Sequence, residues 1–468
     1  MRTEAYTPKA VSMPYPRAIL RYGKPGYIRA MHPSGSRYLA VLRRRPWVAA
    51  LLAAVLVAGA AAVVLTAVLS QPGPPPVPVR VRSWRADIAY LARELPRVHI
   101  HGLTGASQQA WNAAAARLEA QVPELTDGQV RAGLLRQIAL LHDDETNLLL
   151  EWQRIYSFRA VWLGHGLYLT IVPAAHRGLL GAQLEAIDGH PLSEVIARLE
   201  PVIDYDKQDP GIARNAVAGY VGLPDLLNWV GLASSPDSAT FTVRTTAGQR
   251  EDVTLAAISS DQSTISGLSL ARVPATLAQT NAGQPFWLEV LGRRRTVYLK
   301  YNQCVQGARF VKIAARTLTA LRVHPGYRLI VDLRDNPGGD SRPFQALIDG
   351  IRADPAINRR GRIFGLVNGG TDSSATVDAN ALGDQTRAIL MGQEVEDPVD
   401  EFGNNNAFLT LPHSHLRVQY TTAVINGARL RYATPDIVIP TTISQVLAGT
   451  DPALDRAFSY PRPSRAGR

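Results

Sequence analysis

The sequence predicts an α/β domain over residues 286–460. Strand-like and helix-like segments alternate from residue 286 to residue 391, and such alternation indicates a sheet covered by helices. The segment Leu329-Ile330-Val331 is apolar on both faces, as expected for a buried central strand. With 468 residues, 46% of them hydrophobic and 19% charged, the chain has enough apolar material for a sizeable core.

The first 46 residues form a basic arm without helical periodicity. They contain ten Arg or Lys residues and one acid, which gives the arm a charge of +9 out of +11 for the chain. The remainder is nearly neutral, so we expect no nucleic-acid partner. We interpret residues 1–46 as a cytoplasmic arm that contacts anionic lipid.

Residues 47–69 form an uninterrupted apolar run without charge. As a helix this run would span about 34 Å, enough for the hydrocarbon core of a bilayer. The arginines at 43–45 precede it, and the positive-inside rule places that end in the cytoplasm. A cleaved signal peptide is the alternative, but its apolar region and leader would be shorter. We therefore expect a single-pass protein of the cell membrane, with a proline-rich linker at 70–83 and an extracytoplasmic main domain.

Residues 84–152 have the apolar spacing of helices. Ser107 and Thr126 each precede a periodic segment, and both residue types are suited to cap a helix. His99 and His101 lie between the first two helices, where we expect a solvated polar loop rather than a metal site.

Residues 153–285 change to a strand-like pattern. One strand leads into Asp188-Gly189, which is a tight-turn signal. The stretch GAQLEAIDGHPLSEVI around this turn resembles part of a PDZ-like module, which binds an extended peptide along a sheet edge. The same pattern describes an ordinary strand-turn-helix corner, so both interpretations stay open.

The predicted elements of the α/β domain follow one another closely. They are strands at 286–291 and 296–301, a helix at 308–322, a strand at 328–333, a helix at 342–351, a strand at 362–367, a helix at 373–382 and a strand at 388–391. Cys304, the single cysteine of the chain, is interpreted as a small buried hydrophobe rather than a catalytic thiol.

Two loops of this domain could carry chemistry. The first, Asp332 to Asp340, follows a buried strand and contains Gly338-Gly339, whose backbone N–H groups could face an oxyanion. The second, Gly370-Thr371-Asp372-Ser373-Ser374, places a serine hydroxyl at a strand-to-helix turn. Taken separately, each loop also fits an ordinary turn or helix cap.

Taken together, these segments resemble the C-terminal-processing (tail-specific) serine peptidases and their tricorn-core relatives. That family has a strand, a DLR-x-N-x-GG loop, a helix, and a strand that ends at the nucleophile serine. This chain has DLRDNPGGD followed by NGGTDSSA. Softer matches are LTDGQVRAGLLRQIALLHDDETNLLL, GAQLEAIDGHPLSEV, YLKYNQC and TPDIVIPTTISQVLAGTDPALDRAF, so the resemblance covers residues 84–458.

The resemblance implies a ββα-spiral, ClpP/crotonase-like peptidase domain preceded by an N-terminal helical region. It gives Ser373 the nucleophile position and gives the N–H groups of Gly339 and Ser374 the oxyanion hole. It also implies an extended polypeptide as substrate or ligand. No Cys/His cluster has metal-ligand spacing and no phosphate-binding loop is present, so we expect no metal and no cofactor.

The catalytic base departs from the family pattern. Members use either a histidine in a G-D-G-H-T motif or a lysine after the serine. The histidine position is Glu145 here, and the lysine-bearing segment corresponds to residues 391–398, which contain no lysine. An ordinary glutamate is too acidic to accept a serine proton well, so His142, within the same HDDET segment, is the alternative. The other candidates are His165, His413, His415 and Lys300.

Two functions remain open at this point. The first is an active serine peptidase that cleaves extracytoplasmic polypeptides. The second is a catalytically inactive homologue that binds peptides or a partner protein. A purely structural, membrane-tethered domain is a third and weaker interpretation. The groups that lie within reach of Ser373 decide between the first two.

Overall fold

The computed structural model describes residues 77–103, 106–205, 210–395, 402–403, 407–424 and 433–462. The predicted basic arm at 1–46 and the predicted membrane-spanning run at 47–69 lie outside these ranges. Within the ranges, no helix has both the length and the apolar character required to cross a bilayer.

Three helices begin the described chain and form a helical region, as predicted. They are α3 (Val77–Val98), α4 (Gln108–Gln121) and α5 (Asp127–Ile138). Both predicted caps are confirmed. Ser107 Oγ accepts a hydrogen bond from the N–H of Ala110, and Thr126 forms a capping box with Gln129.

The start of α3 differs from the prediction. The helix begins at Val77, so residues 77–83 are helical rather than part of the proline-rich linker. Prolines are tolerated in the first turn of a helix, where their missing N–H is not needed. The Arg80 guanidinium fixes this turn through an ion pair of 2.6 Å with Asp127 and a hydrogen bond of 2.6 Å to the Leu125 carbonyl.

A small antiparallel sheet joins this helical region to a distant part of the sequence. Its strands are β1 (Asn147–Leu149), β18 (Arg417–Gln419) and β17 (Phe408–Thr410), in the order β1-β18-β17. Leu148, Leu409 and Val418 enter the same apolar core as α3, α4 and α5. The sequence assigned these later strands to the domain at 286–460, whereas the structure packs them with the N-terminal helices.

The middle of the chain forms a seven-stranded sheet in the order β10-β4-β5-β7-β8, with β3 beside β4 and β6 beside β5. The strands are β3 (Arg159–Leu163), β4 (Gly166–Pro173), β5 (Gln183–Ile187), β6 (His190–Pro191), β7 (Ser238–Arg244), β8 (Arg250–Ala256) and β10 (Leu270–Arg272). The predicted tight turn at Asp188-Gly189 joins β5 to β6, with positive φ at both residues.

Helices cover this sheet and complete its core. They are α6 (Leu192–Leu199), α7 (Pro210–Tyr220) and α8 (Pro224–Trp229). Three short elements complete this region: strand β2 (Arg154–Ile155), which pairs with β9 (Ile258–Ser259), and helix α9 (Gln262–Ser266). Later in the chain, β16 (Phe402–Gly403) pairs with β19 (Ala423–Val424). The segment 259–284 therefore contains α9 and β10.

A six-stranded sheet forms the predicted α/β domain, in the order β11-β12-β13-β14-β15-β20. Its strands are β11 (Phe286–Leu291), β12 (Thr296–Tyr301), β13 (Arg328–Asp332), β14 (Ile363–Val367), β15 (Ile389–Gly392) and β20 (Ile437–Val438). Only β11 is antiparallel to its neighbour, and the other pairs are parallel.

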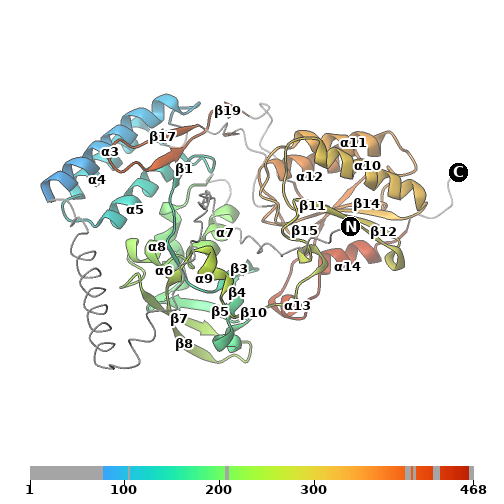
Figure 1. Cartoon of the computed structure of the whole chain (residues 1–468), viewed down its shortest axis with the longest axis horizontal. Helices are drawn as coiled ribbons and strands as arrows, with labels where there is room; N and C mark the ends of the chain where they lie inside the picture. The colour runs from blue at the N-terminus through green and yellow to red at the C-terminus, as the bar shows by residue number, and fades with distance from the viewer. Residues whose placement is uncertain are drawn as a thin grey trace, which may run out of the picture.

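Helices cover both faces of this sheet (Figure 1). One face carries α10 (Ala308–Val323), α11 (Gln345–Arg352) and α12 (Ser374–Gln385), and the other carries α14 (Pro452–Ser459), which follows α13 (Ile443–Leu447). Side chains of β13 alternate between the two cores: Leu329 and Val331 face α10 to α12, and Ile330 faces α14. Because β13 and β14 are adjacent and parallel, the loops that follow them meet at one edge of the sheet.

Candidate active site

Ser373 lies immediately before α12, at the end of the loop that follows β14. Its backbone has φ 54° and ψ −123°, a conformation that residues other than glycine rarely adopt. The Ser373 side chain makes no capping hydrogen bond to α12, so the helix-cap interpretation is not supported. A serine held in a strained strand-to-helix turn is typical of a nucleophile elbow, which exposes the hydroxyl for attack.

Gly338 packs directly against Ser373. A Cβ atom added at Gly338 would lie 2.7 Å from Ser373 Cβ and 2.9 Å from the backbone nitrogen of Ser374. Gly338 also has a positive φ of 83°. Only glycine meets both demands, and the structure brings the two predicted motifs together here.

Gly339 is held from the other side by Cys304. A Cβ atom at Gly339 would lie 1.9 Å from the Cys304 carbonyl oxygen. The Cys304 N–H donates to the Gly338 carbonyl at 3.1 Å, and the Asp340 N–H donates to the Cys304 carbonyl at 3.0 Å. These bonds leave the Gly339 N–H without a hydrogen-bond partner among the described residues, as expected for an oxyanion donor.

Ser374 supplies the second N–H of this arrangement. It is the first residue of α12, and the first N–H groups of a helix have no partner within the helix. Its hydroxyl donates to the Gly339 carbonyl at 2.8 Å and so ties the helix to the glycine loop. Ser373, Gly339 and Ser374 therefore lie together, with two backbone donors near one hydroxyl.

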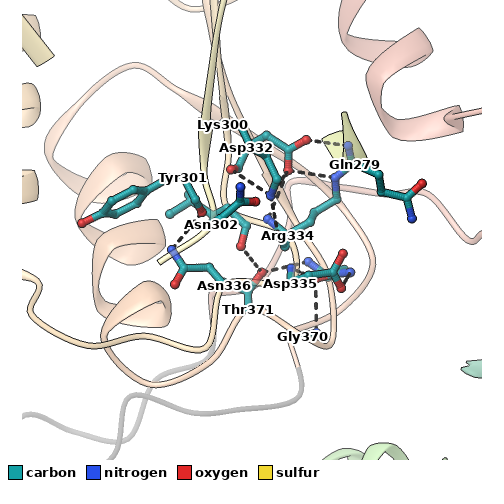
Figure 2. A network of polar contacts seen from close by, with 12 residues as sticks. Gln279, Lys300, Tyr301, Asn302, Asp332, Arg334, Asp335, Asn336, Gly370 and Thr371 are labelled. Atoms are coloured by element: carbon teal, nitrogen blue, oxygen red, sulfur yellow. Dashed lines mark hydrogen bonds and ion pairs between the residues drawn. The ribbon is translucent and has the colours of Figure 1, made fainter. Parts of the chain in front are cut away.

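Asn336 links the two loops beneath this group. Its amide donates to the Tyr301 carbonyl at 2.9 Å, and its side-chain oxygen accepts from the Gly338 N–H at 3.0 Å. Its backbone carbonyl accepts from the Asp372 N–H at 2.9 Å. One buried residue thus fixes the glycine loop, the serine loop and strand β12 with respect to one another (Figure 2).

A second set of contacts joins the loops at their outer ends. Asn368 donates to Asp335 Oδ1 at 3.0 Å and accepts from the Asp335 N–H at 3.0 Å. The Thr371 hydroxyl, which is fully buried, donates to the Leu333 carbonyl at 3.2 Å. These contacts offset the strain at Ser373, because the surrounding structure leaves the turn no alternative position.

A buried ionic network lies at the start of the glycine loop. The Arg334 guanidinium pairs with Asp332 at 2.6 Å and with both carboxylate oxygens of Asp451 at 2.8 Å. Tyr298 donates to Asp332 at 2.6 Å. Burial alone would raise the pKa of Asp332, but Arg334 and Lys300 hold that pKa well below its usual value.

Lys300 belongs to this network and not to the serine. Its ammonium donates to the Arg334 carbonyl at 2.5 Å and lies 3.4 Å from Asp332 Oδ1, and its side chain is only 2% exposed. Figure 2 shows the lysine directed into the network. Lys300 therefore stabilises the loop, and its proposed role as a base is not supported.

The predicted base segment lies in the N-terminal region, after α5. Glu145 is buried, and its N–H donates to Asp143 Oδ1 at 2.9 Å. His142 has a left-handed backbone conformation with φ 52°, and its Nδ1 lies 3.3 Å from the Tyr205 carbonyl. His142 also lines a cavity of about 560 Å³ bordered by α4, α5 and Tyr205. The Glu145 carbonyl also accepts from the Gln419 side chain at 3.5 Å, so this segment is joined to the strand β18 as well.

Asp204 adds a further carboxyl group to this segment. Both of its carboxyl oxygens are buried and lack a hydrogen-bond partner among the described residues. Burial raises the pKa of Asp204 well above its usual value, and the nearby charges of Asp143, Asp144 and Glu145 raise it further. Burial among other acids therefore favours the neutral form of Asp204, and sequence reasoning missed this residue because no motif marks it.

His99 lies in a buried polar contact, and the predicted solvated loop is wrong for this residue. Its Nε2 lies 2.6 Å from Asp143 Oδ2, and both side chains are fully buried. Thr146 and Thr421 also donate to Asp143 Oδ2, at 2.8 Å and 2.7 Å. Burial alone would raise the pKa of Asp143, but the hydrogen bonds from His99, Thr421 and Thr146 hold it below its usual value.

The remaining histidine candidates lie elsewhere. His165 is exposed in the turn between β3 and β4, and the backbone N–H of His413 donates to Asp87 of α3 at 2.8 Å. His415 occupies the same turn as His413. In the part of the chain described, no hydrogen bond or ion pair joins these three side chains to Ser373.

Cys304 is a buried thiol, as predicted. Its Sγ donates to Asp378 Oδ2 at 3.3 Å. Burial and the neighbouring Asp378 raise the pKa of the thiol far above its usual value, so it is not a thiolate nucleophile. The backbone of Cys304, rather than its sulfur, contributes to the site.

One contact connects the middle region of the chain to the serine loop. The Asn215 side chain, on α7, donates to the Gly369 carbonyl at 3.0 Å. Gly369 lies four positions before the serine, so α7 borders the candidate site. No sequence signal pointed to this contact, because α7 itself was not predicted.

Among the described residues, no group of three or more His, Cys, Asp or Glu side chains has the geometry of a metal site. The Asp143 carboxylate instead bonds to the His99 ring and accepts from the Glu145 N–H. The chemistry that this arrangement supports is thus a hydroxyl beside backbone donors.

Comparison with known proteins identifies the fold. No family model and no curated protein matches the sequence. The solved structure of mature CPAF complexed with lactacystin matches over 81% of this chain and 98% of that chain, with 13% identity and a TM-score of 0.57. A second structure of mature CPAF gives 12% identity, coverages of 81% and 97%, and a TM-score of 0.55.

A photosystem II D1 C-terminal processing protease also matches, over 79% of this chain and 98% of that chain, with 15% identity and a TM-score of 0.40. That score is too low to support a residue-level comparison. The CPAF matches show a shared fold across most of the chain. The predicted likeness to C-terminal-processing serine peptidases is therefore confirmed at the level of the fold.

Proposed function

From the fold that this chain shares with C-terminal-processing serine peptidases, we propose that it is a serine-type peptidase that acts on polypeptides, with Ser373 as its nucleophile. The strained backbone of Ser373, packed against Gly338, is the observation that carries the proposal. Strain of this kind costs stability and is kept where a reactive group must be presented. The Gly339 and Ser374 N–H groups beside it suit the negative charge that develops during acyl transfer.

In the proposed reaction the Ser373 hydroxyl oxygen attacks the carbonyl carbon of a peptide bond. The hydroxyl proton passes to a base, and the carbonyl oxygen becomes an oxyanion held by the Gly339 and Ser374 N–H groups. The carbon–nitrogen bond then breaks, and the amine leaves with that proton. Water hydrolyses the resulting ester and regenerates the serine.

We assign the base to the segment 142–146. If His142 Nδ1 donates its proton to the Tyr205 carbonyl, its Nε2 is left as a proton acceptor, which is the tautomer that a general base requires. Glu145 occupies the family position of the base, and a carboxylate there suits the orientation of a substrate or a cation better than proton abstraction.

A second function, polypeptide binding without cleavage, is favoured by one observation. The segment 142–146 and Asp204 place four carboxyl groups where the resembled family has a histidine. Acids at this position disfavour an imidazole-based mechanism but would not prevent a polypeptide from binding beside the serine. In that case the Gly338 loop is retained for fold rather than for reaction.

A fluorophosphonate probe separates the two functions. We expect the wild-type protein to be labelled at one site and Ser373→Ala to lose the label entirely, because phosphonylation requires an activated serine hydroxyl. Lactacystin, which is bound in one of the CPAF structures, is a second probe for the same site. Ser374→Ala is the comparison variant, since it keeps Ser373 and the backbone donor and removes only the hydroxyl that bonds to Gly339; it should still be labelled, at a lower rate. Wild-type protein that is folded but unlabelled would favour binding without cleavage.

We also propose that the folded region lies outside the cytoplasm, anchored by residues 47–69. The apolar run, the arginines before it and the prolines after it support this placement. A cysteine introduced at an exposed position such as Glu151 should react with a membrane-impermeant maleimide on intact cells. Reaction only after cell lysis would contradict the proposed topology.

A further inference from the structure

The C-terminal helix α14 contacts both ends of strand β13, the strand that leads into the glycine loop. At one end, Arg328 donates to the carbonyls of Ala457 and Phe458, both at 2.8 Å, and to the carbonyl of Tyr460. These carbonyls lie at the C-terminal end of α14, where a cation is favourable because the helix dipole is negative there.

Two positions beyond the other end of β13, Arg334 binds Asp451, the residue that caps the start of α14. Its two terminal nitrogens each lie 2.8 Å from a carboxylate oxygen of Asp451. This fork-to-fork geometry fixes orientation as well as distance. Asp451 also accepts a hydrogen bond from the Leu454 N–H at 3.0 Å, so the same carboxylate caps α14.

The ion pair between Arg334 and Asp451 lies at the start of the loop that carries Gly338 and Gly339. The Arg334 carbonyl accepts from Lys300, and its guanidinium is also held by Asp332 at 2.9 Å and 2.6 Å. Arg334 is therefore fixed by ionic contacts at the point where the glycine loop begins. Four positions later the chain reaches Gly338.

The charges of this network balance only when Asp451 is present. Asp332 and Asp451 carry two negative charges, and Lys300 and Arg334 carry two positive charges, in a site where all four side chains are at most 15% exposed. Removal of one charge from a buried, balanced group leaves its partner unpaired, and the partner then moves toward water or toward another acceptor.

We propose that Asp451 is a positioning residue for the oxyanion loop, acting through Arg334, so that helix α14 is part of the machinery that holds Gly339 in place. The proposal rests on the function proposed above for the loop itself. It does not require Asp451 to touch a substrate.

The substitution Asp451→Asn tests this contact selectively. Asparagine is as good a helix cap as aspartate, so α14 keeps its first turn, while the negative partner of Arg334 is lost. The matched control is Asp261→Asn, which makes the same change at the cap of α9 in another region, where Asp261 accepts from the Thr264 N–H at 2.8 Å. Arg334→Lys is the second variant, because it keeps the charge and removes the fork.

Amide hydrogen exchange is the primary measurement, because it does not depend on activity. The N–H groups of Asp335, Gly338 and Asp340 are hydrogen-bonded in the loop and should be protected. In Asp451→Asn and in Arg334→Lys we expect their exchange to accelerate about tenfold or more, with unchanged exchange in the hairpin of β7 and β8. Unchanged loop exchange in both variants would overturn the proposal.

The labelling rate at Ser373 is the second measurement. A displaced oxyanion loop should lower the maximal rate of fluorophosphonate labelling about tenfold and leave the half-saturating probe concentration unchanged. If Asp451 served overall folding alone, the molecules that remain folded would show an unchanged maximal rate and an unchanged half-saturating concentration. Equal maximal rates in wild type, Asp261→Asn and Asp451→Asn would count against the proposal. Absence of labelling in the wild type would refute the proposed activity, and the exchange result would still decide the role of Asp451.

Discussion

At the scale of single residues, the site combines a strained serine with glycines that nothing else can replace. Ser373 has a positive φ, and Gly338 leaves no room for a Cβ atom between the serine and the glycine loop. Asn336 and Asn368 then supply the hydrogen bonds that hold both loops in this arrangement. The residue that departs from the family pattern, Glu145, follows α5 and makes none of the hydrogen bonds that hold these two loops together.

The substitution Glu145→His tests whether position 145 reaches the serine. If the segment 142–146 faces Ser373, an imidazole there supplies a base with a pKa near neutrality, and we expect the fluorophosphonate labelling rate to rise on the order of a hundredfold. The exposed Glu151→His is the matched control, because it adds the same side chain nearby. Equal rates for the two variants and the wild type would show that position 145 does not serve Ser373.

At the scale of elements, local capping and packing explain why the helices of the N-terminal region form where the sequence predicts them. Thr126 and Gln129 form the capping box of α5, in which each side chain accepts a hydrogen bond from the backbone N–H of the other residue. Gly128 and Gly133 of the same helix make room for Trp229 and Leu118, since a Cβ atom at either glycine would lie within 2.3 Å of the neighbouring side chain. Close packing thus offsets the low helix propensity of glycine.

Removal of the cap should destabilise the region measurably. We expect Thr126→Ala to lower the free energy of unfolding by about 1 kcal/mol, because the Gln129 N–H loses its acceptor and the Gln129 side chain loses its hydrogen bond from the Thr126 hydroxyl. Ser107→Ala at α4, whose cap makes a single bond, should cost less. Urea titration followed by circular dichroism measures both, and a larger loss for Ser107→Ala would contradict the argument.

At the scale of the whole molecule, distant parts of the sequence depend on one another. Strands β17 and β18 lie between β15 and β20 in the sequence, but they pair with β1 of the N-terminal region. Thr421, which follows β18, donates a hydrogen bond to Asp143. Helix α14 returns to the six-stranded sheet and binds Arg328 and Arg334. The N-terminal helices, the candidate base segment and the C-terminal part of the chain are therefore joined by contacts between residues that lie far apart in the sequence.

The Asp143 network makes stability depend on acid pH. Because the pKa of Asp143 is lowered in the folded state, its contribution is present above the unfolded value of about 3.9 and is lost as pH falls through the folded value. We expect Asp143→Asn to destabilise the protein by roughly 3 kcal/mol at neutral pH and to reduce the loss of stability below pH about 4. Urea unfolding at several pH values tests this, with exposed Asp237→Asn as the control. Parallel pH profiles for wild type and Asp143→Asn would contradict the assignment.

The sequence by itself determined the order and type of most elements in residues 286–391, the helix caps, and the two loops that carry Ser373 and Gly339. These features depend on local patterns, such as apolar periodicity, capping residues and glycine pairs, which a single chain displays directly. It did not reveal α7, α8 or the partners of β1, because a short strand is specified by its neighbours more than by its own residues.

Only the tertiary structure decided which polar side chains serve the site. Lys300 is bonded to Asp332 and to the Arg334 carbonyl, and His99 is buried against Asp143. Asp451 binds Arg334, which lies 117 positions away in the sequence. The physical reason is that a charge inside a protein must be paired, and the partner is chosen by proximity in space, which local sequence patterns do not encode.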